Sequence, residues 1–401
     1  MKVKWIIQPP IYMVMLLLLT SCWNSRELND MAIVTGIGID KAPNSDEYRV
    51  TFQIVNPSAT ATSVGASTGQ PPITVYTTTD RTLFGALRKT SRKAARQLFF
   101  AHTQLLIIGE SMAKSGINGL FDVFERSHEL RLNSVVIVSR ETDAASVLKI
   151  LLPIESIPAM AVVKKNKNTA KLWGENRAIS VFELINTITG EGEPVISGVQ
   201  IYGDLDKGSK KSHLEQSQVE AVISLSGLAV FKEGKLKGWL DGPEARGTMW
   251  VQNKLEQTSI NIDSEKEQDS IAVIINHSKT KVKVNLREGV PVFHIYIKEE
   301  GSINEIKDFV DISQRKELYK LEKEIALKTK GEVVKSLQVA QSMECDIFNF
   351  GNELKRTDPK AWKTVKKNWV SLFAKGELDV HVEAYIRSTG MRSKPYQQNE
   401  E

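Results

Sequence analysis

The residue with the clearest chemical capacity is Cys22, which stands directly after an apolar run near the start of the chain. A cysteine thiolate is a soft nucleophile that makes a stable thioether, so this side chain is suited to covalent modification. The segment before it contains Lys2 and Lys4, an apolar stretch over residues 11–19 and then small residues. Charged, apolar and small-residue regions in this order are typical of a secretory signal. The N-terminus therefore predicts export.

The residues Leu19-Thr20-Ser21-Cys22 resemble the lipobox of bacterial lipoproteins. The resemblance implies that diacylglycerol is attached to the Cys22 thiol and that residues 1–21 are removed as a signal peptide. Two acyl chains give durable anchoring, whereas one chain gives only marginal membrane binding. The alternatives are an ordinary signal with a chance cysteine and a short uncut anchor. Because the apolar run is well short of the roughly 20 residues of a spanning helix, the sequence favours lipid attachment.

A run of cations between two predicted strands is the sharpest charge feature of the chain. Thr82 is expected to cap a helix that runs to about Leu98, with apolar residues on its buried side. Cations four residues apart share one face of a helix. That face would contain Arg88, Lys89, Arg92, Lys93 and Arg96. It suits anionic lipid headgroups or acidic loops of a membrane partner, although a solvated helix face is the more usual explanation.

The residues that catalysis or metal binding would need do not form a recognisable pattern. Six histidines are scattered without an i, i+4 pair and without cysteine neighbours, namely His102, His128, His213, His277, His294 and His381. No Gly-x-Ser-x-Gly turn and no phosphate-binding loop is present. The one local cluster, His128-Glu129 between Arg126 and Arg131, reads as a surface charge network. We therefore predict no catalytic residues, no metal and no cofactor.

Composition describes an ordinary globular chain that can bury a core. Of its 401 residues, 41% are hydrophobic and 25% are charged, and this length suggests two or three domains. The net charge of +5 is spread along the sequence, which argues against nucleic-acid binding. After lipidation of Cys22 only Cys345 remains, so no intramolecular disulfide is expected. No later window has the apolar length of a membrane helix, so the lipid and partner proteins would supply membrane contact.

The elements that follow the anchor alternate between strands and helices, which predicts an N-terminal α/β domain over residues 22–190. Strands over 32–40 and 48–55 are joined by turn residues and read as a hairpin. Residues 57–70, rich in Ser, Thr, Ala and Gly, predict an inserted loop. The remaining elements are a strand over 103–108, a helix over 111–127, a strand over 133–139, a short helix after Thr142 and a helix capped by Ser180.

The second half of the chain predicts two further domains and a polar tail over residues 391–401. A small middle domain over 191–253 contains a hairpin and a short helix after Gly242. A C-terminal α+β domain over 254–390 contains an antiparallel sheet packed by long helices. Its elements are strands over 259–262, 270–277, 279–286 and 290–298, helices over 312–343 and 358–376, and a last strand over 377–386. The whole is an α+β chain of three mixed α/β domains.

The order of motifs along the chain resembles the GerAC, or Ger(x)C, family of spore germination lipoproteins. The resemblance covers essentially the full length and is specific because anchor, order and spacing agree. It is carried by Cys22-Trp23-Asn24-Ser25-Arg26-Glu27-Leu28-Asn29-Asp30, Gly36-Ile37-Gly38-Ile39-Asp40, Phe99-Phe100-Ala101-His102-Thr103-Gln104, Ile107-Ile108-Gly109-Glu110, Phe124-Glu125-Arg126, Glu129-Leu130-Arg131, Gly227-Leu228-Ala229-Val230-Phe231-Lys232, Lys235-Leu236, Gly238, Asp346-Ile347-Phe348, Gly351, Trp362 and Trp369.

The resemblance implies a non-enzymatic C subunit of a nutrient germinant receptor. Such a subunit lies on the outer face of the spore inner membrane beside membrane-spanning A and B subunits, which it would assemble, stabilise or report on. The alternative is a solute-binding lipoprotein of a membrane transporter, which needs two similar parallel α/β lobes joined by a hinge. A cell-wall enzyme is the third candidate and needs a carboxylate pair or metal site.

Overall fold

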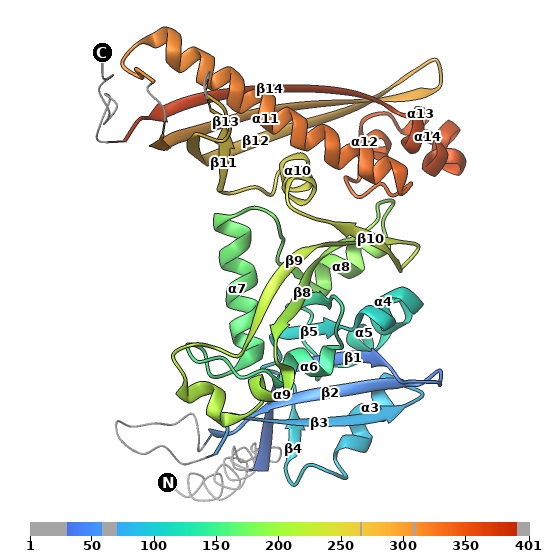
Figure 1. The fold of residues 1–401 in the computed structure, drawn as a ribbon. Helices are drawn as coiled ribbons and strands as arrows, with labels where there is room; N and C mark the ends of the chain where they lie inside the picture. The colour runs from blue at the N-terminus through green and yellow to red at the C-terminus, as the bar shows by residue number, and fades with distance from the viewer. Residues whose placement is uncertain (1–29, 58–69, 265–266, 308–309, 391–401) are drawn as a thin grey trace, which may run out of the picture.

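The fold consists of two β-sheets placed one above the other along the long axis of the molecule (Figure 1). The computed structural model describes residues 30–57, 70–264, 267–307 and 310–390. The first sheet occupies the N-terminal half of the chain, and the second sheet occupies the C-terminal part. The two sheets are joined by a helix, α10 (Pro243–Val251).

The first sheet has ten strands, in the order β10-β9-β8-β6-β5-β1-β2-β3, with β4 paired to β1 and β7 paired to β6. Its central strands β8, β6, β5 and β1 are parallel, and the strands on either side are antiparallel. The strands are β1 (Met31–Lys41), β2 (Tyr48–Val55), β3 (Ile73–Asp80), β4 (Gln97–Phe99), β5 (Leu105–Ile108), β6 (Val135–Ser139), β7 (Ile179–Ser180), β8 (Val195–Gly203), β9 (Ala221–Lys232) and β10 (Lys235–Leu240).

Both faces of this sheet are buried at its centre, as the continuous apolar run of β5 requires. Leu106 and Ile108 belong to one hydrophobic cluster and Leu105 and Ile107 belong to another, and all four are fully buried. The helical segments of this half are α3 (Leu83–Thr90), α4 (Glu110–Ser115), η2 (Asn118–Leu120), α5 (Asp122–Arg126), α6 (Ala144–Lys149), α7 (Pro158–Leu172), α8 (Val181–Ile188), α9 (Leu205–Gly208) and η3 (Lys211–Glu215).

Several local predictions for the N-terminal half are confirmed. β1 and β2 form the expected antiparallel hairpin. Thr82 caps α3 by accepting a hydrogen bond from the Gly85 amide at 2.9 Å. Ser180 and Glu183 form a reciprocal capping box at the start of α8.

Two predicted helices in this half are wrong in length. The helix expected from Thr82 to about Leu98 ends at Thr90, since residues 97–99 leave the helix to pair with β1 as β4. The helix expected over 111–127 is broken into α4, η2 and α5. Gly116, which has φ +125°, ends α4 because few residues other than glycine adopt this backbone conformation.

The predicted middle segment over 191–253 does not form a sheet of its own. Its strands β8, β9 and β10 continue the N-terminal sheet, with β8 parallel to β6 and the β9–β10 hairpin antiparallel at the edge. The short helix expected after Gly242 is present as α10 and contains Met249 and Trp250. The change from one sheet to the other therefore falls at α10.

The second sheet has four strands in the order β11-β12-β13-β14. They are β11 (Thr258–Ile262), β12 (Ile271–Arg287), β13 (Val290–Ile306) and β14 (Glu377–Ser388), and β12 is one bulged strand where two were predicted. The expected antiparallel pairing holds for the first three, but β14 runs parallel to β13. A parallel pair requires the chain to cross back from the end of β13 to the end where β13 begins, and the helices between β13 and β14 make this crossing.

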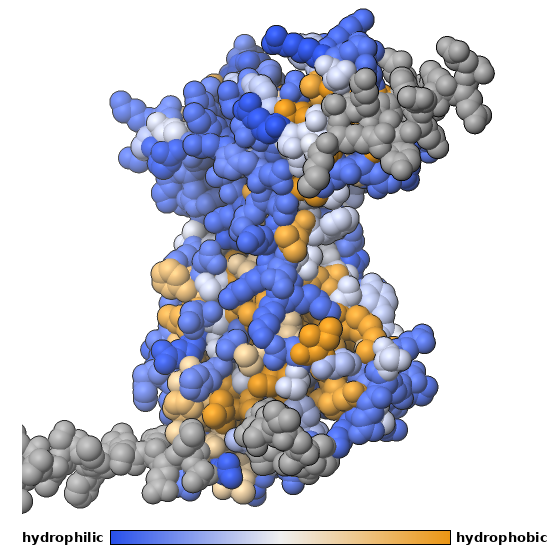
Figure 2. All heavy atoms as spheres, turned by 90° about the vertical axis from the view of Figure 1, so that its left-hand side faces the viewer, coloured by the Kyte–Doolittle hydropathy of each residue, from blue (hydrophilic) through white to orange (hydrophobic). Residues whose placement is uncertain are grey.

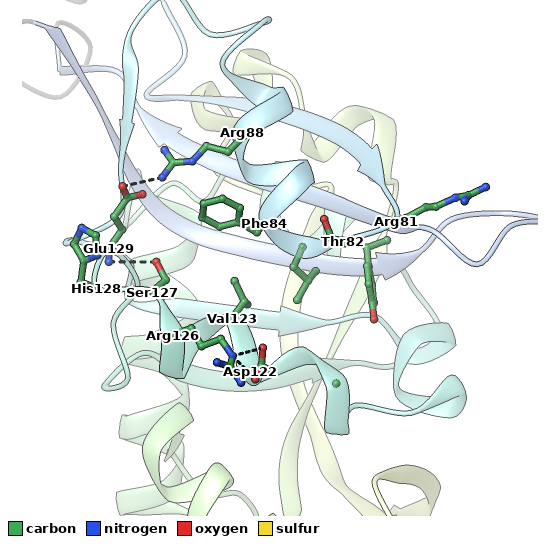
Figure 3. A pocket seen from close by; sticks show the side chains of 13 residues that line it. Arg81, Thr82, Phe84, Arg88, Asp122, Val123, Arg126, Ser127, His128 and Glu129 are labelled. Carbon is green, nitrogen blue, oxygen red and sulfur yellow. Dashed lines mark hydrogen bonds and ion pairs between the residues drawn. The ribbon is translucent and has the colours of Figure 1, made fainter.

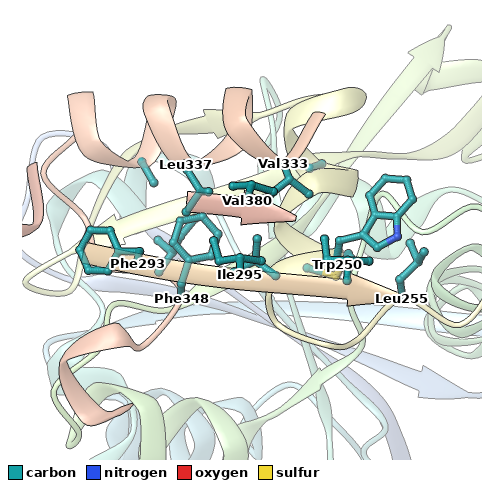
Figure 4. Packing of buried hydrophobic residues seen from close by; sticks show 14 of the residues in the cluster. Trp250, Leu255, Phe293, Ile295, Val333, Leu337, Phe348 and Val380 are labelled. Atoms are coloured by element: carbon teal, nitrogen blue, oxygen red, sulfur yellow. The ribbon is translucent and has the colours of Figure 1, made fainter. Parts of the chain in front are cut away.

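Helices cover one face of the second sheet. They are α11 (Arg315–Ser342), α12 (Phe350–Thr357), α13 (Pro359–Val365), η4 (Lys366–Asn368) and α14 (Trp369–Lys375). The single helix predicted over 358–376 is thus interrupted by a 3₁₀ turn, although its apolar residues Trp362, Val365, Trp369 and Phe373 are buried as expected. Figure 4 shows Leu337 and Val333 of α11 packed over Ile295 and Val380 of the sheet.

A buried ion-pair network joins the two halves. Arg246 of α10 donates to both carboxylate oxygens of Glu332 in α11, at 2.8 and 2.5 Å, and to Glu175 of the N-terminal half at 3.2 Å. The side chains of Arg246 and Glu332 are only 8% and 5% exposed. Beside them, Thr248 and Ser336 hydroxyls are 2.8 Å apart. The geometry is bidentate and desolvated, so α10 is fixed firmly to α11.

Candidate functional site

Two depressions lie at the end of the N-terminal sheet where β1 begins, and a third extends from His128 and Glu129 along α3 to Tyr48. Met31 lines two of them, and His128 and Glu129 line two of them. Asp30, just before β1, is eight residues from Cys22, and eight extended residues span at most about 29 Å. A lipid on Cys22 would therefore hold this end of the molecule within about 29 Å of the membrane surface.

One depression, of about 510 Å³, lies between α3 and the C-terminal end of α5 (Figure 3). An arginine–carboxylate pair lies on each side of it. Arg88 contacts Glu129 at 3.1 Å, and Arg126 contacts Asp122 at 2.8 and 2.9 Å. The Phe84 ring lies beside them, with the Arg88 guanidinium 4.8 Å from the ring centre. The depression thus offers two opposed ion pairs next to an apolar surface.

These ion pairs suit recognition of charged groups. The four paired side chains are between 29% and 78% exposed, and exposed pairs of this kind contribute only about 0–1 kcal/mol. An incoming carboxylate or cation can therefore replace one partner at little cost. The predicted charge network around His128 is only partly assembled, because Glu129 pairs with Arg88 of α3 and Arg131 donates to the Ala101 carbonyl at 3.2 Å.

The five cations expected on one helical face are not on one face, because α3 ends at Thr90. Only Arg88 and Lys89 are in the helix. Lys89 and Lys93 donate to the backbone carbonyls of Thr79 and Thr77, at 2.8 and 2.6 Å, along β3. β3 is the edge of the sheet, and cations that cover an edge protect its unpaired backbone groups. These two lysines therefore have a structural role.

Arg92 and Arg96 remain as candidates for membrane or partner contact. Both are exposed in the turn between α3 and β4. β4 pairs with β1 at Met31 and Gln97, so Arg96 lies beside the first residue of β1. Arg92 and Arg96 thus lie at the end of the molecule that a lipid on Cys22 would reach.

The buried acids hold elements together. Asp40 accepts hydrogen bonds from the Ala144 and Ala145 amides at the start of α6, and Asp346 accepts from the Phe350 and Gly351 amides and the Trp369 indole. Burial raises the pKa of both carboxyls. Burial also raises the pKa of the Cys345 thiol to about 12, which makes it a poor nucleophile.

Within the described ranges, no group of three His, Cys, Asp or Glu side chains could hold a metal ion. In the same residues, no helix is both long enough and apolar enough to cross a bilayer. The predicted lipid-attachment residue Cys22 and the predicted lipobox residues Leu19, Thr20 and Ser21 lie outside the described residues, as do most of the predicted 57–70 loop and the 391–401 tail.

One surface that sequence reasoning missed is the outward face of the second sheet. Lys279, Lys281 and Lys283 alternate along β12 and project from the face opposite α11. The signal was present as a Lys-x-Lys-x-Lys alternation, but the interpretation stopped at the strand that this alternation predicts.

Comparison with known proteins places these features in one family. A family model described as "Spore germination protein N-terminal domain" matches residues 24–201, and one described as "Spore germination B3/ GerAC like, C-terminal" matches residues 226–390. The chain is 34% identical to spore germination protein KC of Bacillus subtilis (strain 168), with 94% of each chain covered. It is 26% identical to spore germination protein YndF of the same organism, with 97% and 99% covered.

The fold is also found in a solved structure. The crystal structure of the GerBC protein aligns with a TM-score of 0.55 at 19% identity, covering 88% of this chain and 97% of that chain. This likeness confirms the α+β fold.

Proposed function

Since the chain belongs to the GerAC-like family of spore germination proteins, we propose that it is the non-catalytic, lipid-anchored C subunit of a nutrient germinant receptor. In this proposal diacylglycerol on Cys22 holds the protein at the outer face of the spore inner membrane. There it assembles with membrane-spanning A and B subunits or relays their state. The single observation that supports this most strongly is the 34% identity over 94% of both chains.

The arrangement of the N-terminal half supports the orientation. The start of β1, two of the depressions and the exposed pair Arg92 and Arg96 all lie at one end of the molecule. Cations near an anionic surface each contribute about 1 kcal/mol to membrane attraction. Figure 2 shows hydrophobic residues gathered over the N-terminal half on the face it presents, whereas the C-terminal half is mostly hydrophilic there. We therefore propose that the membrane-spanning subunits contact the N-terminal half.

The rival function, a solute-binding lipoprotein, requires two similar parallel lobes. The two sheets of this protein are unlike, with ten strands around a parallel centre in one and four largely antiparallel strands in the other. The network around Arg246 also fixes the join between them, where a solute-binding protein needs a hinge.

Substitution of the two cysteines tests the anchor. We expect Cys22→Ala to release the protein from membranes and to impair nutrient germination through its receptor. Cys345→Ala is the matched control. Because the Cys345 thiol is buried, this substitution should leave membrane retention unchanged. Fractionation of spores followed by immunoblotting measures both. Full membrane retention of the Cys22→Ala protein in a strain without the A and B subunits would contradict lipid anchoring.

Deletion of the gene tests the receptor role independently. The proposal predicts the loss of at least one nutrient germination response, or lower levels of the companion subunits. If every nutrient response and both subunit levels are unchanged, the receptor assignment is wrong.

A further inference from the structure

The outward face of the second sheet is rich in cations and aromatic rings. Alternate residues of β12, β13 and β14 form it, in register across the three strands. Lys281, Tyr296 and His381 make one row, and Lys279, Lys298 and Glu383 make the next. We call this surface the cationic sheet face; it consists of His277, Lys279, Lys281, Lys283, His294, Tyr296, Lys298, Glu300, Asp379, His381, Glu383, Tyr385 and Arg387.

Each acid on this face already contacts a basic side chain of the same face. Glu383 contacts Lys298 at 2.9 Å, and Glu300 contacts Arg387 at 2.7 Å. A further acid, Asp379, contacts both His294 and His381, at 2.6 and 2.8 Å. The lysines of this face that have no acidic contact are therefore those of β12.

The lysines of β12 form a row of three. Lys279, Lys281 and Lys283 are exposed, and they have no acidic partner among the described residues. A strand rises about 3.3 Å per residue, so their ammonium groups leave the strand at intervals of about 6.6 Å. An extended peptide has the same interval between alternate side chains, so three acidic residues at alternate positions match the three lysines.

The middle of the face provides a flat aromatic contact. The Tyr296 ring is stacked with His381 at 5.4 Å and with His294 at 6.5 Å, and each pair is 9° from parallel. Tyr296 is 41% exposed. A depression of about 610 Å³ runs from Lys279 and Lys281 across Tyr296 to Arg387. Tyrosine and arginine side chains are enriched at protein interfaces.

We propose that the cationic sheet face docks an extended acidic segment of a protein partner, with carboxylates at alternate positions facing the three lysines of β12. Carboxylates at alternate positions of a peptide can meet the lysine row alone, whereas a nucleic acid, with a negative charge on every phosphate, would also meet the acids of β13 and β14. The face also lies in the half of the molecule away from β4 and the start of β1 (Figure 1), which disfavours lipid headgroups. This last argument rests on the proposed anchor at Cys22.

Fluorescence anisotropy of labelled peptides with the full lipidated chain in neutral detergent tests the proposal. The probe is a nine-residue peptide with Glu at alternate positions and Thr between them, and its reference has Gln in place of Glu. We expect the probe to bind and the reference not to bind. The triple variant Lys279→Gln/Lys281→Gln/Lys283→Gln should weaken probe binding about tenfold, because it removes three charge pairs that are each weak at an exposed surface.

The matched control is Lys363→Gln/Lys366→Gln/Lys367→Gln, which removes three exposed lysines from the helical side of the same half. It should change probe affinity less than twofold. Equal losses in both variants, or no probe binding to the unmodified protein, would overturn the proposal. The proposal would also be overturned if the protein bound vesicles with 20% phosphatidylglycerol, or a single-stranded oligonucleotide, in preference to the probe, and if the Lys279/Lys281/Lys283 variant lost that binding. None of these outcomes depends on germination, so the receptor role is tested separately.

Discussion

The two sheets of this protein differ in how many of their faces are buried. In the N-terminal sheet, β5 places apolar side chains into hydrophobic clusters on both faces. In the C-terminal sheet, β12 and β13 bury one face under α11 and expose lysines and tyrosine on the other. A strand covered on both sides is a scaffold whose residues are set by packing, whereas a strand covered on one side has a face that is free for binding. The N-terminal sheet is therefore the packed scaffold at its centre, and the C-terminal sheet has an outward face that can bind a partner.

Breaking the join between the sheets should have the largest effect. Arg246→Met leaves Glu332 buried without its partner, and the loss of one partner of a buried pair costs about 3–5 kcal/mol. Urea denaturation should show this loss, and the double variant Arg246→Met/Glu332→Leu should recover most of it. Arg126→Met, at an exposed pair, is the control and should change stability by less than about 1 kcal/mol. A single Arg246→Met variant as stable as this control would contradict a fixed join.

Truncating one side chain in a central strand of each sheet to alanine should show the difference between the two sheets. Ile107→Ala removes a fully buried side chain of β5 and should cost about 2–5 kcal/mol. Lys281→Ala, on the exposed face of β12, should stay within about 0.5 kcal/mol. Thermal or urea unfolding of the two variants measures both values. Similar losses would mean that the outward face of β12 is part of a packed core.

The inward face of the second sheet contains a group whose titration should be visible in stability. Glu299 is fully buried, and burial raises its pKa to about 8. Thr329 of α11 donates to one carboxyl oxygen at 2.8 Å, while the other oxygen has no hydrogen-bond partner in the described structure. Glu332 of α11, which pairs with Arg246, and Trp250 of α10 also face this group.

The carboxyl of Glu299 should stay protonated in the folded protein up to about pH 8, while the unfolded chain ionises above about pH 4.5. Its contribution to stability is therefore complete below pH 4.5 and is lost as pH rises toward 8, at no more than about 1.4 kcal/mol per pH unit. Glu299→Gln should flatten the fall in unfolding free energy between pH 5 and 8. Parallel pH profiles for the variant and the original chain would show that Glu299 ionises normally.

Local sequence signals predicted the elements whose cause is local. The Thr82 cap, the Ser180 capping box and the β1–β2 hairpin depend on residues within a few positions of one another. The buried face of Trp362 and Trp369 was readable from helical spacing even though a 3₁₀ turn divides the helix.

The failures arose where distant contacts decide the outcome. Residues 91–96 contain helix-forming Ala, Arg and Lys, yet the helix ends at Thr90, before the predicted end at about Leu98, because Gln97 pairs with Met31. The break at Gly116 had a visible signal that was passed over. The parallel direction of β14 depends on the path of four helical segments, which periodicity cannot supply. The sequence identified the five cations of the candidate site. It could not predict that some of them contact the β3 edge while Arg92 and Arg96 lie exposed in a turn, because this depends on where the chain leaves the helix.

We propose that the N-terminal end meets the membrane while the cationic sheet face is directed away from it. Cys22 would be acylated and Cys345 is buried, so a single introduced cysteine would be the reactive thiol for an NBD label. We would place it by Arg92→Cys or by Lys281→Cys in the lipidated protein, and measure quenching by vesicles with spin-labelled headgroups. The account predicts strong quenching at position 92 and little at position 281. Equal quenching, or stronger quenching at position 281, would contradict it.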